Sequence, residues 1–493
     1  MHPHSELPSL RATVRLEGKN IINQTQWYDV KFYPYTAPGV DPIFAATGGR
    51  FTIICRCVLE SNNSVEVLRL FKDEQVENPD GEPFCFNSLE WSQAENGDPL
   101  VCVSGNMSQI KVLNVITGEL VTTLIGHGSH INDLAMSRIN PSILASASID
   151  HSVRIWSLNP AHKKQPTAAI CFGQGHKDQV LTLAYHRKGR YVLSGGMDTR
   201  VNLWMVPDNL EERMGTDKPA MIHYPHFSTT EIHTDFVDCV HFFGDVIISH
   251  AAREYIILMW RIDGFNSDRD PPGPAPIPPS QAVNSHSKVS VPTSSISGTR
   301  SAWGGRFQRL LQFDLPDHNQ FYIRFNIFHA IGAHPILVAG NENSKLFFWD
   351  LQRLEDAGIG DDPSVSASSS AVQSTSSGHI GVATTKLGRG GKAAKAAKAA
   401  NAAKITKIPK IPNRGIGDPF RSVEPHKEIT IQGYTFVFRQ MAWSPDGQWC
   451  VATGDVSLIH ILHRWEDGVP PPEVGAGDGS VMERVVNPSL ETA

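Results

Sequence analysis

Short segments of alternating apolar and polar residues recur along the chain in units that end on a tryptophan. The clearest unit spans 126–156 (GHGSHINDLAMSRINPSILASASIDHSVRIW), and its apolar positions predict three short strands separated by tight turns. A second unit, 175–204 (GHKDQVLTLAYHRKGRYVLSGGMDTRVNLW), repeats the order of the first. Self-similarity of this length indicates a repeat architecture in which neighbouring units bury one another's apolar faces.

The polar residues that both units share add a second signal. Each unit starts on Gly-His and places an Asp six residues before its final Trp; these residues are His127, Asp150 and Trp156 in the first unit and His176, Asp198 and Trp204 in the second. A unit of this kind resembles a WD40 repeat, one blade of a β-propeller. We expect the Asp to orient the His, the His to bond a strand Ser, and the indole N–H to find an acceptor, because such partners make burial of these groups tolerable.

The same residue types raise a catalytic alternative. His127, Ser148 and Asp150 resemble the parts of a hydrolase triad. Their recurrence in the second unit favours a scaffold role, and the sequence contains no GxSxG nucleophile elbow. We therefore expect that this chain is not an enzyme.

Five further units extend the pattern to a ring of seven. Trp260 and Trp349 end the fifth and sixth units, each six residues after a polar turn position. An alternating segment at 11–17 is placed to supply the strand that closes the ring against the last unit. The predicted fold class is therefore all-β, a seven-bladed WD40 β-propeller over residues 11–467.

Two long stretches interrupt the ring pattern. Residues 264–305 are rich in Pro and Ser, and residues 356–419 are rich in Ser and then in Lys and Ala. We expect both to be disordered insertions, between blades five and six and between blades six and seven, because removing them restores a regular spacing of the blades. Residues 1–10 are predicted to be a disordered N-terminus, and residues 468–493 a polar C-terminal tail.

Composition narrows the remaining possibilities. The chain has 493 residues and a formal net charge of −6, and its apolar runs are strand-sized, so no membrane span is expected. The seven cysteines are odd in number and none lies in a CxxC or Cys/His cluster with zinc spacing. They are expected to be reduced core residues, and neither a metal site nor a cofactor is predicted.

The second insertion ends in a basic tract. Nine Lys or Arg and no acidic residue lie between 386 and 414. A solvated linker is the favoured interpretation. The alternative is weak contact of 386–414 with nucleic-acid phosphates, since each phosphate neutralised by a cation adds salt-dependent affinity.

Aromatic residues at strand starts indicate where a ligand binds. Aromatics at the start of a blade's innermost strand lie near a channel mouth, and blades six, seven, one and two are consecutive around the ring. The candidates are Phe321 and Tyr322 in blade six, Phe84 and Phe86 in blade two, and Phe44 in blade one, with Arg324 and Arg439 nearby. Converging rings would form a cage that holds a methylated ammonium by cation–π attraction. The alternative is that these rings are ordinary core.

Several segments resemble one family of proteins closely. They are 125–134 (IGHGSHINDL), 175–185 (GHKDQVLTLAY), 195–204 (GGMDTRVNLW), 227–240 (FSTTEIHTDFVDCV), 321–325 (FYIRF) and 345–351 (KLFFWDL). The chain resembles the embryonic ectoderm development / extra sex combs family, the WD40 subunit of Polycomb repressive complex 2. The match covers nearly all the predicted blades, and the two insertions suggest a lineage-specific, fungal-type member.

The resemblance implies a nuclear, non-catalytic scaffold with two binding faces. One face reads trimethyl-lysine on the histone H3 tail through an aromatic cage. The other holds an N-terminal helix of the SET-domain histone methyltransferase subunit; a zinc-finger subunit completes the implied partners. Reading the mark would stimulate the methyltransferase, which is allostery between two sites. The alternative is a scaffold that assembles the complex without reading methyl-lysine.

The resemblance also implies individual site residues. Phe44, Phe86, Phe321 and Tyr322 correspond to the family's cage, with Phe84 as the alternative to Phe86. Arg324, Arg439 and Asp455 correspond to polar residues that line the peptide-binding rim. Phe321 stands where the animal proteins have Trp, and Phe86 where they have Tyr. A weaker cage is expected, because Trp is the best cation–π partner.

Overall fold

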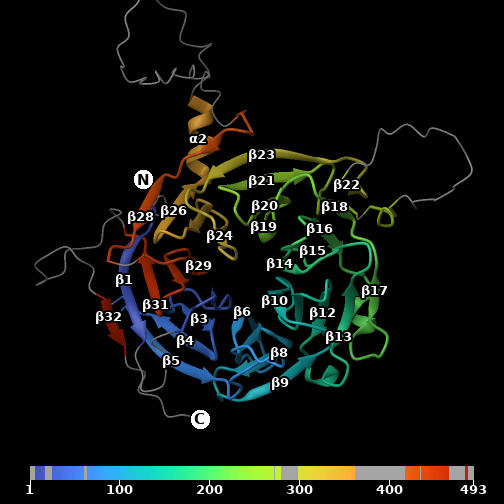
Figure 1. Ribbon diagram of the computed structural model, residues 1–493, viewed down its shortest axis with the longest axis horizontal. Helices are drawn as coiled ribbons and strands as arrows, with labels where there is room; N and C mark the ends of the chain where they lie inside the picture. The colour runs from blue at the N-terminus through green and yellow to red at the C-terminus, as the bar shows by residue number, and fades with distance from the viewer. Residues whose placement is uncertain are drawn as a thin grey trace, which may run out of the picture.

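Seven sheets surround one axis in the computed structural model, and their innermost strands face that axis (Figure 1). The structure describes residues 6–16, 25–59, 64–270, 272–278, 298–360, 417–433, 435–465 and 483–486. Each sheet is built on an antiparallel meander that runs outward from the innermost strand. The predicted seven-bladed all-β propeller is confirmed.

The blades follow the order of the chain. Blade one contains β2 (Asp29–Phe32), β3 (Ile43–Gly48), β4 (Phe51–Cys57) and β5 (Val65–Lys72); blade two contains β6 (Phe86–Gln93), β7 (Pro99–Gly105), β8 (Met107–Asn114) and β9 (Leu120–Ile125); blade three contains β10 (Ile131–Met136), β11 (Ile143–Ser148), β12 (Val153–Ser157) and β13 (Thr167–Cys171). Blade four contains β14 (Val180–Tyr185), β15 (Tyr191–Gly196), β16 (Val201–Met205) and β18 (Phe227–Thr229), and blade five contains β19 (Val237–Phe243), β20 (Val246–Ala251), β21 (Ile256–Ile262) and β23 (Phe307–Asp314). Blade six contains β24 (Phe325–Phe328), β25 (Ile336–Gly340), β26 (Lys345–Asp350) and β28 (Lys427–Thr430), and blade seven contains β29 (Phe438–Trp443), β30 (Trp449–Gly454), β31 (Leu458–His463) and β1 (Ser9–Leu16).

Four blades carry a fifth strand at the outer edge. These strands are β17 (Ala220–Ile222) on blade three, β22 (Thr299–Ser301) on blade four, β27 (Ser422–Val423) on blade five and β32 (Glu483–Val486) on blade seven. Short helices lie at the periphery: α1 (Leu210–Arg213), α2 (Leu351–Gly360) and the 3-10 turn η2 (Pro160–His162). Within the described ranges, no helix is both long and apolar enough to cross a membrane.

The positions predicted for the two insertions need correction. The fourth strand of blade five, β23, follows the stretch 264–305, and the fourth strand of blade six, β28, follows 356–419. Both stretches therefore interrupt a blade between its third and fourth strands and do not lie between blades. The spacing of the blades could not show where in a blade an insertion lies. Removing the insertion restores the same distance between successive blades, whichever strands of the blade it separates. The range 264–305 is also too wide, since β22 lies inside it. The basic tract 386–414 lies outside the described residues.

The N-terminal strand closes the ring, as predicted. β1 pairs antiparallel with β31, and β32 pairs in parallel with the other side of β1. The predicted propeller range, 11–467, was too narrow at both ends. β1 starts at Ser9, inside the predicted N-terminal segment 1–10, and β32 lies inside the predicted C-terminal tail 468–493. The last blade is thus assembled from both ends of the chain (Figure 1).

The core consists of apolar layers between neighbouring blades. One layer joins blades seven and one, and includes Trp27, Phe32, Phe44 and Ile461. Six of the seven cysteines are buried and free, and Cys85 is partly exposed and free. Six of the cysteines are thus core residues, as predicted, and their reduced state stays a prediction.

Candidate functional site

The polar residues that blades three and four share form hydrogen-bond chains. In blade three, His127 Nδ1 lies 2.8 Å from Asp150 Oδ2, and His127 Nε2 lies 2.7 Å from Ser146 Oγ. The indole N–H of Trp156 donates to the same Ser146 Oγ over 2.7 Å. The predicted chain from Asp to His to Ser to Trp is therefore present. The serine is Ser146, however, and not Ser148, which donates to the carbonyl of His130 over 2.7 Å.

Blade four repeats this arrangement atom for atom. His176 lies 2.9 Å from Asp198 and 2.8 Å from Ser194, and Trp204 donates to Ser194 over 2.9 Å. In blade three, burial lowers the pKa of His127 even though Asp150 opposes this, so the imidazole is held neutral. A repeated, buried arrangement has no exposed nucleophile, and it serves as blade scaffold.

The remaining predicted blade residues show two variants. Trp260 donates to Ser249 over 2.9 Å, and His233 bridges Ser249 and Glu254, so blade five has the same chain with Glu in place of Asp. Trp349 donates instead to the carbonyl of Val423 over 3.0 Å. That carbonyl belongs to β27, so the blade-six Trp anchors the segment that returns from the second insertion.

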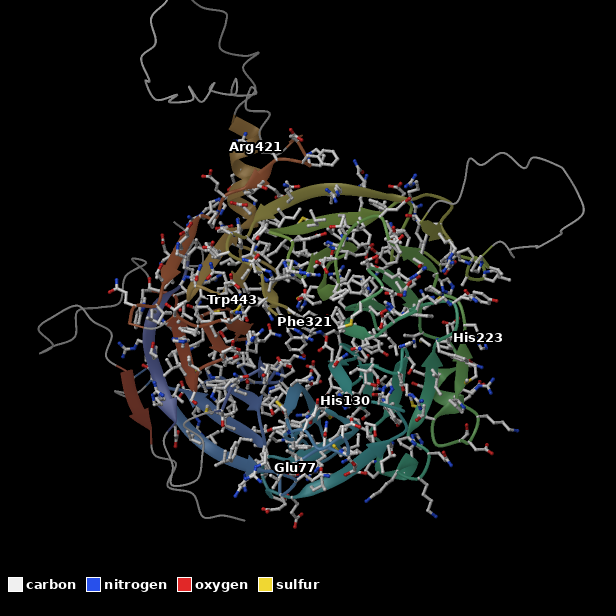
Figure 2. All side chains as sticks on the ribbon, viewed as in Figure 1. Glu77, His130, His223, Phe321, Arg421 and Trp443 are labelled. Carbon is white, nitrogen blue, oxygen red and sulfur yellow. The ribbon has the colours of Figure 1, made fainter. Side chains whose placement is uncertain are left out.

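Three aromatic rings meet at one end of the ring's axis. Phe321 lies near the axis in projection, in contrast to His223 and Arg421 at the perimeter (Figure 2). The ring centroids of Phe321 and Tyr322 are 5.8 Å apart, and those of Tyr322 and Tyr28 are 6.4 Å apart with the planes at 74°. Phe321 is 37% exposed and Tyr28 is partly exposed, whereas Tyr322 is buried. We call these three residues the aromatic mouth.

Tyr322 is held by all its polar atoms. Its φ of 66° lies in the left-handed region, which is costly for a residue with a side chain. Its N–H donates to Asp238 Oδ2 over 3.0 Å, and its hydroxyl lies within hydrogen-bond distance of the carbonyls of Asn87 (3.2 Å) and Asn132 (2.8 Å). Blade six therefore reaches across the axis to blades two and three. A strained conformation fixed from several sides is typical of a functional site.

A ring of β-bulges supplies these anchor groups. In blades two, three, four, five and seven, the ladder between the first two strands shifts register, at Asn87, Asn132, Leu181, Asp238 and Arg439 respectively. A bulged residue leaves the regular ladder, so its polar groups are free for other partners. All five bulged residues bond the segment 321–324. The mouth is therefore built on five equivalent positions of the repeat.

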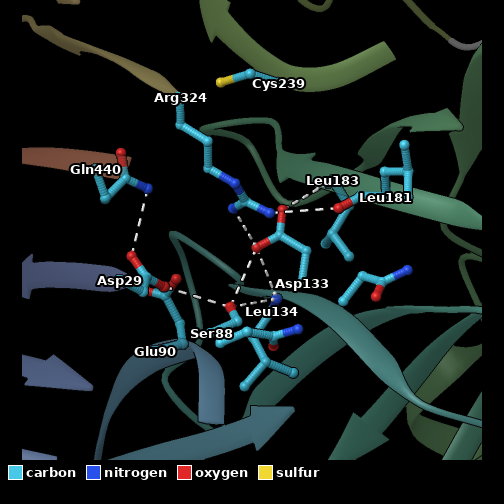
Figure 3. A network of polar contacts seen from close by, with 12 residues as sticks. Asp29, Ser88, Glu90, Asp133, Leu134, Leu181, Leu183, Cys239, Arg324 and Gln440 are labelled. Atoms are coloured by element: carbon cyan, nitrogen blue, oxygen red, sulfur yellow. Dashed lines mark hydrogen bonds and ion pairs between the residues drawn. The ribbon is translucent and has the colours of Figure 1, made fainter. Parts of the chain in front are cut away.

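Arg324 takes part in a polar network with residues of several blades, including Asp133 and Leu181 (Figure 3). Its guanidinium is 4.5 Å from the centroid of the Tyr322 ring, and it donates to Asp133 Oδ1 over 2.8 Å. It also donates to the Tyr322 hydroxyl oxygen over 3.1 Å. Arg324 is only 5% exposed, so the structure places it behind the cage and not on the peptide-binding rim predicted from the resemblance.

Further links of the network join the other blades. Ser88 Oγ lies within hydrogen-bond distance of both Asp29 (3.3 Å) and Asp133 (3.2 Å), and Gln440 donates to Asp29 over 3.3 Å. Burial raises the pKa of Asp29, with Lys31 and Arg324 opposing. Burial acts on Asp133 in the same sense, but Arg324 and Lys31 outweigh it, so the pKa of Asp133 lies below its usual value and this carboxylate stays ionised. The positive charge under Tyr322 is thereby compensated.

Arg439 and Asp455 lie beside the backbone of Phe321. Arg439 Nε donates to Asp455 Oδ1 over 2.5 Å and Nη2 donates to Asp455 Oδ2 over 2.9 Å. The Nη1 group donates to the carbonyl of Phe321 over 2.6 Å. Both residues are partly exposed. They form the wall of the mouth on the blade-seven side.

Two of the aromatic residues predicted for the cage do not reach the mouth. Phe44 is 0% exposed and packs on Phe32 in the layer between blades seven and one, with ring centroids 5.6 Å apart. Phe86 and its alternative Phe84 pack on each other, 4.8 Å apart, in the next layer of the core. The reason is that Phe44 belongs to a second strand and Phe86 points between blades, so neither side chain faces the axis.

Tyr28 is the mouth residue that the sequence analysis missed. It directly precedes Asp29, the first residue of the innermost strand of blade one. The rule that aromatics at the start of innermost strands face a mouth would have selected it. Its hydroxyl donates to Gln26 Oε1 over 2.5 Å, which fixes the phenol at the rim. Burial raises the pKa of the Tyr28 phenol, with smaller influences from Cys85 and Asp455.

The fold and the site define a class: a WD40-repeat β-propeller with an aromatic mouth suited to a cationic ligand. Comparison with known proteins agrees, since the family model WD domain, G-beta repeat matches residues 118–157 and 169–205. The chain is 35% identical to the Polycomb protein EED of Chaetomium thermophilum, over 96% of this chain and 98% of that relative. It is 25% identical to the Polycomb protein esc of Drosophila melanogaster, over 64% of this chain and 68% of that relative. The chain therefore belongs to the embryonic ectoderm development / extra sex combs family, the WD40 subunits of Polycomb repressive complex 2.

Solved structures give the same assignment. The chain is similar to one from a humanized mutant of the Chaetomium thermophilum Polycomb Repressive Complex 2 bound to the inhibitor GSK343, with a TM-score of 0.75, 35% identity, and coverage of 94% of this chain and 99% of that chain. It is also similar to one from a structure of ctPRC2 in complex with H3K27me3 and H3K27M, with a TM-score of 0.71, 34% identity, and coverage of 94% of this chain and 98% of that chain.

Proposed function

We propose that this chain is a non-catalytic subunit of Polycomb repressive complex 2 that reads trimethyl-lysine on the histone H3 tail. The observation that carries the proposal is the aromatic mouth of Tyr28, Phe321 and Tyr322. A trimethylammonium group has no N–H to donate, so it is recognised by the negative faces of aromatic rings and not by hydrogen bonds. The ionised Asp133 keeps the positive charge of Arg324 compensated below the mouth.

The relatives support this proposal. One similar structure contains Polycomb repressive complex 2 together with H3K27me3. By analogy, this chain holds the SET-domain methyltransferase subunit through an N-terminal helix of that subunit, contacts the zinc-finger subunit, and acts in the nucleus. Reading the mark stimulates the methyltransferase in this scheme, which requires that the peptide and the methyltransferase bind with reciprocal coupling.

A second candidate is a scaffold that assembles the complex without reading methyl-lysine. The observation that favours it is the composition of the mouth, which has three rings and no Trp, the best cation–π partner. The side of Tyr322 that faces Arg324 is already occupied by the guanidinium. A cage of this kind binds a cation more weakly than one with an indole. The two candidate functions therefore differ in the affinity that they predict for the trimethyl-lysine peptide.

A peptide titration tests the proposal. Histone H3 tail peptides with and without trimethyl-lysine are titrated against the chain and against the variant Tyr28→Ala. Each cage ring contributes about 0.5–2 kcal/mol, so loss of one ring lowers affinity for the trimethyl peptide by roughly 2- to 30-fold. Tyr35→Ala is the matched control, because Tyr35 follows the same strand, β2, at its other end.

The outcomes separate the two candidates. Selective binding of the trimethyl peptide that weakens in Tyr28→Ala and persists in Tyr35→Ala supports a reader. Equal binding of modified and unmodified peptides by the unaltered chain leaves the scaffold. Deleting 386–414 tests the predicted nucleic-acid contact separately: DNA affinity that is unchanged at low salt contradicts it.

A further inference from the structure

We infer that Arg439 is a positioning residue for the aromatic mouth and makes no contact with the ligand; this rests on the proposed function and deepens it. The resemblance places Arg439 on a peptide-binding rim. In the structure, its side chain instead connects blade seven to the backbone that carries two of the three rings. Arg439 therefore acts on ligand affinity through Phe321.

The hydrogen-bond count of the guanidinium supports this role. An arginine side chain has five N–H donors and no acceptor. Two donors bond the carboxylate of Asp455, at 2.5 and 2.9 Å. Two more point at the carbonyls of Phe321 and Tyr322, at 2.6 and 3.5 Å, and the fifth points at Gln320 Oε1, at 3.4 Å. Every donor thus has a partner within the chain, and none is left for a peptide carbonyl or hydroxyl.

The backbone makes the connection reciprocal. The N–H of Arg324 donates to the carbonyl of Arg439 over 3.0 Å. Arg439 therefore bonds the chain on both sides of Tyr322. Its carbonyl accepts from the N–H of Arg324, and its guanidinium donates to the carbonyl of Phe321. Asp455 fixes the plane of the guanidinium, because the bidentate pair is geometrically rigid. The blade-seven strand and its turn consequently set the direction of the segment 321–324.

Phe321 is the ring whose position depends most on the hydrogen bonds of Arg439 to Asp455 and to the Phe321 carbonyl, which we call the Arg439 clamp. Tyr322 is anchored by its hydroxyl and by Arg324, and Tyr28 by its hydroxyl. Phe321 has no polar group on its side chain, is 37% exposed, and has a ring contact only with Tyr322 among the described residues. Its position is therefore set mainly by its backbone. If the carbonyl of Phe321 is released, the ring moves and the mouth loses one wall.

The chain offers a matched control for a charge-removing substitution. Arg253 forms a similar bidentate pair with Asp235, at 2.8 and 3.0 Å, on the turns of blade five. Among the described residues, its side chain bonds Asp235 and none of the three mouth residues. Arg439→Gln and Arg253→Gln each remove one arginine from one aspartate. Only the first is expected to change ligand binding.

Two probes are titrated against each variant: the trimethyl-lysine histone H3 peptide and tetramethylammonium, which has no peptide part. A positioning role predicts that Arg439→Gln lowers affinity for both probes by about the same factor, roughly 5- to 30-fold, the upper part of one ring's contribution. Arg439→Lys is expected to restore part of the loss, because an ammonium reaches the carbonyl without the rigid fork. Loss of peptide binding with unchanged tetramethylammonium binding would mean that Arg439 touches the peptide, and would overturn the inference.

A double-mutant cycle gives the decisive measurement. The Phe321→Leu variant has no aromatic ring at this position for the Arg439 clamp to position. In that variant, Arg439→Gln is therefore expected to change the affinity for either probe by less than about 2-fold. An undiminished loss in that background contradicts the inference, as does a comparable loss in Arg253→Gln. If the unaltered chain binds neither probe, the proposed function fails. In that case the fluorine NMR signal of 4-fluorophenylalanine at position 321 still decides: Arg439→Gln shifts it and Arg253→Gln does not if Arg439 positions the ring.

Discussion

Two kinds of buried polar network occur in the described part of this propeller, and they differ in how they use the repeat. The chains in blades three and four each stay inside one blade and have the same hydrogen-bond partners, with His, Asp, Ser and Trp at the same places in the repeat. The network under the mouth joins several blades, which contribute four different residue types to it: Arg324, Ser88, Gln440, and the aspartates Asp29 and Asp133. Equal residues at equal positions indicate scaffold, whereas different residues at equal positions indicate a specialised site.

The largest effect expected is from breaking the network under the mouth. Asp133→Ala leaves Arg324 buried with its closest carboxylate removed, and breaking a buried pair costs about 3–5 kcal/mol. We expect a loss of that size in the free energy of unfolding, measured by chemical denaturation, together with weaker trimethyl-peptide binding because Tyr322 loses its support. The double variant Asp133→Ala/Arg324→Met removes both charges and should recover most of the stability. A double variant as unstable as Asp133→Ala would show that the charge is not the cause.

A smaller effect is expected from breaking the scaffold network. Ser146→Ala removes the acceptor shared by His127 and Trp156, and leaving buried donors unsatisfied costs about 1–3 kcal/mol. Ser194→Ala in blade four should cost a similar amount, since its partners are the same. Neither substitution should alter peptide affinity once the protein is folded. A selective change in binding would mean that the scaffold and the mouth are not separate.

Acid should also separate the two regions, and over the first pH unit below 6.5 its effect, about 1.4 kcal/mol or less, is the smallest of the three. Burial lowers the pKa of His460, on β31, from its ordinary 6.5 to about 3. The folded chain keeps this imidazole neutral while the unfolded chain protonates it, so its contribution is complete above pH 6.5 and is lost as the pH falls toward 3. The loss reaches up to about 1.4 kcal/mol per pH unit, and His460→Gln should flatten this dependence in denaturation measurements.

The control for the pH experiment is His151→Asn at an exposed position with a φ of 67°, which Asn tolerates. The slope of stability against pH should stay unchanged in this variant. Peptide affinity should vary little between about pH 7 and 5.5, because the pKa of Asp133 lies below its usual value and the carboxylate stays ionised. An affinity that falls together with stability would contradict the separation of mouth and scaffold.

The scaffold could be predicted from the sequence because its signal is repeated. The Gly-His start and the Asp-to-Trp step occur twice in nearly identical form, and this repetition predicts both the blades and the structural role of His127 and His176. The first unit alone cannot show which of its two alternating serines points to the His, because Ser146 and Ser148 lie on the same face of β11. Comparison of the two units selects Ser146, since Ser194 stands at its place in blade four and Gly196 stands at the place of Ser148.

The mouth could be predicted only in part. Phe321, Tyr322 and Arg439 were placed at the right end of the ring, since their segments start innermost strands. Phe44 and Phe86 were wrong as mouth residues, because facing toward the axis or toward the core depends on strand order and on the bulges, which leave no mark in composition. Arg324 was assigned to the rim and lies below it, because bonds from Asp133 across the axis draw it inward.

The pairing of β1 with β31 has a consequence for how the protein is made. Residues 9–16 are synthesised before the other described strands of the ring, but their partner strand, β31, is among the last of them. A nascent chain therefore carries an open strand edge through most of its synthesis, and such edges invite association with other chains. Closure also requires contacts between distant parts of the sequence, which form slowly. Shielding of this first strand by a chaperone during translation would raise the yield of closed rings.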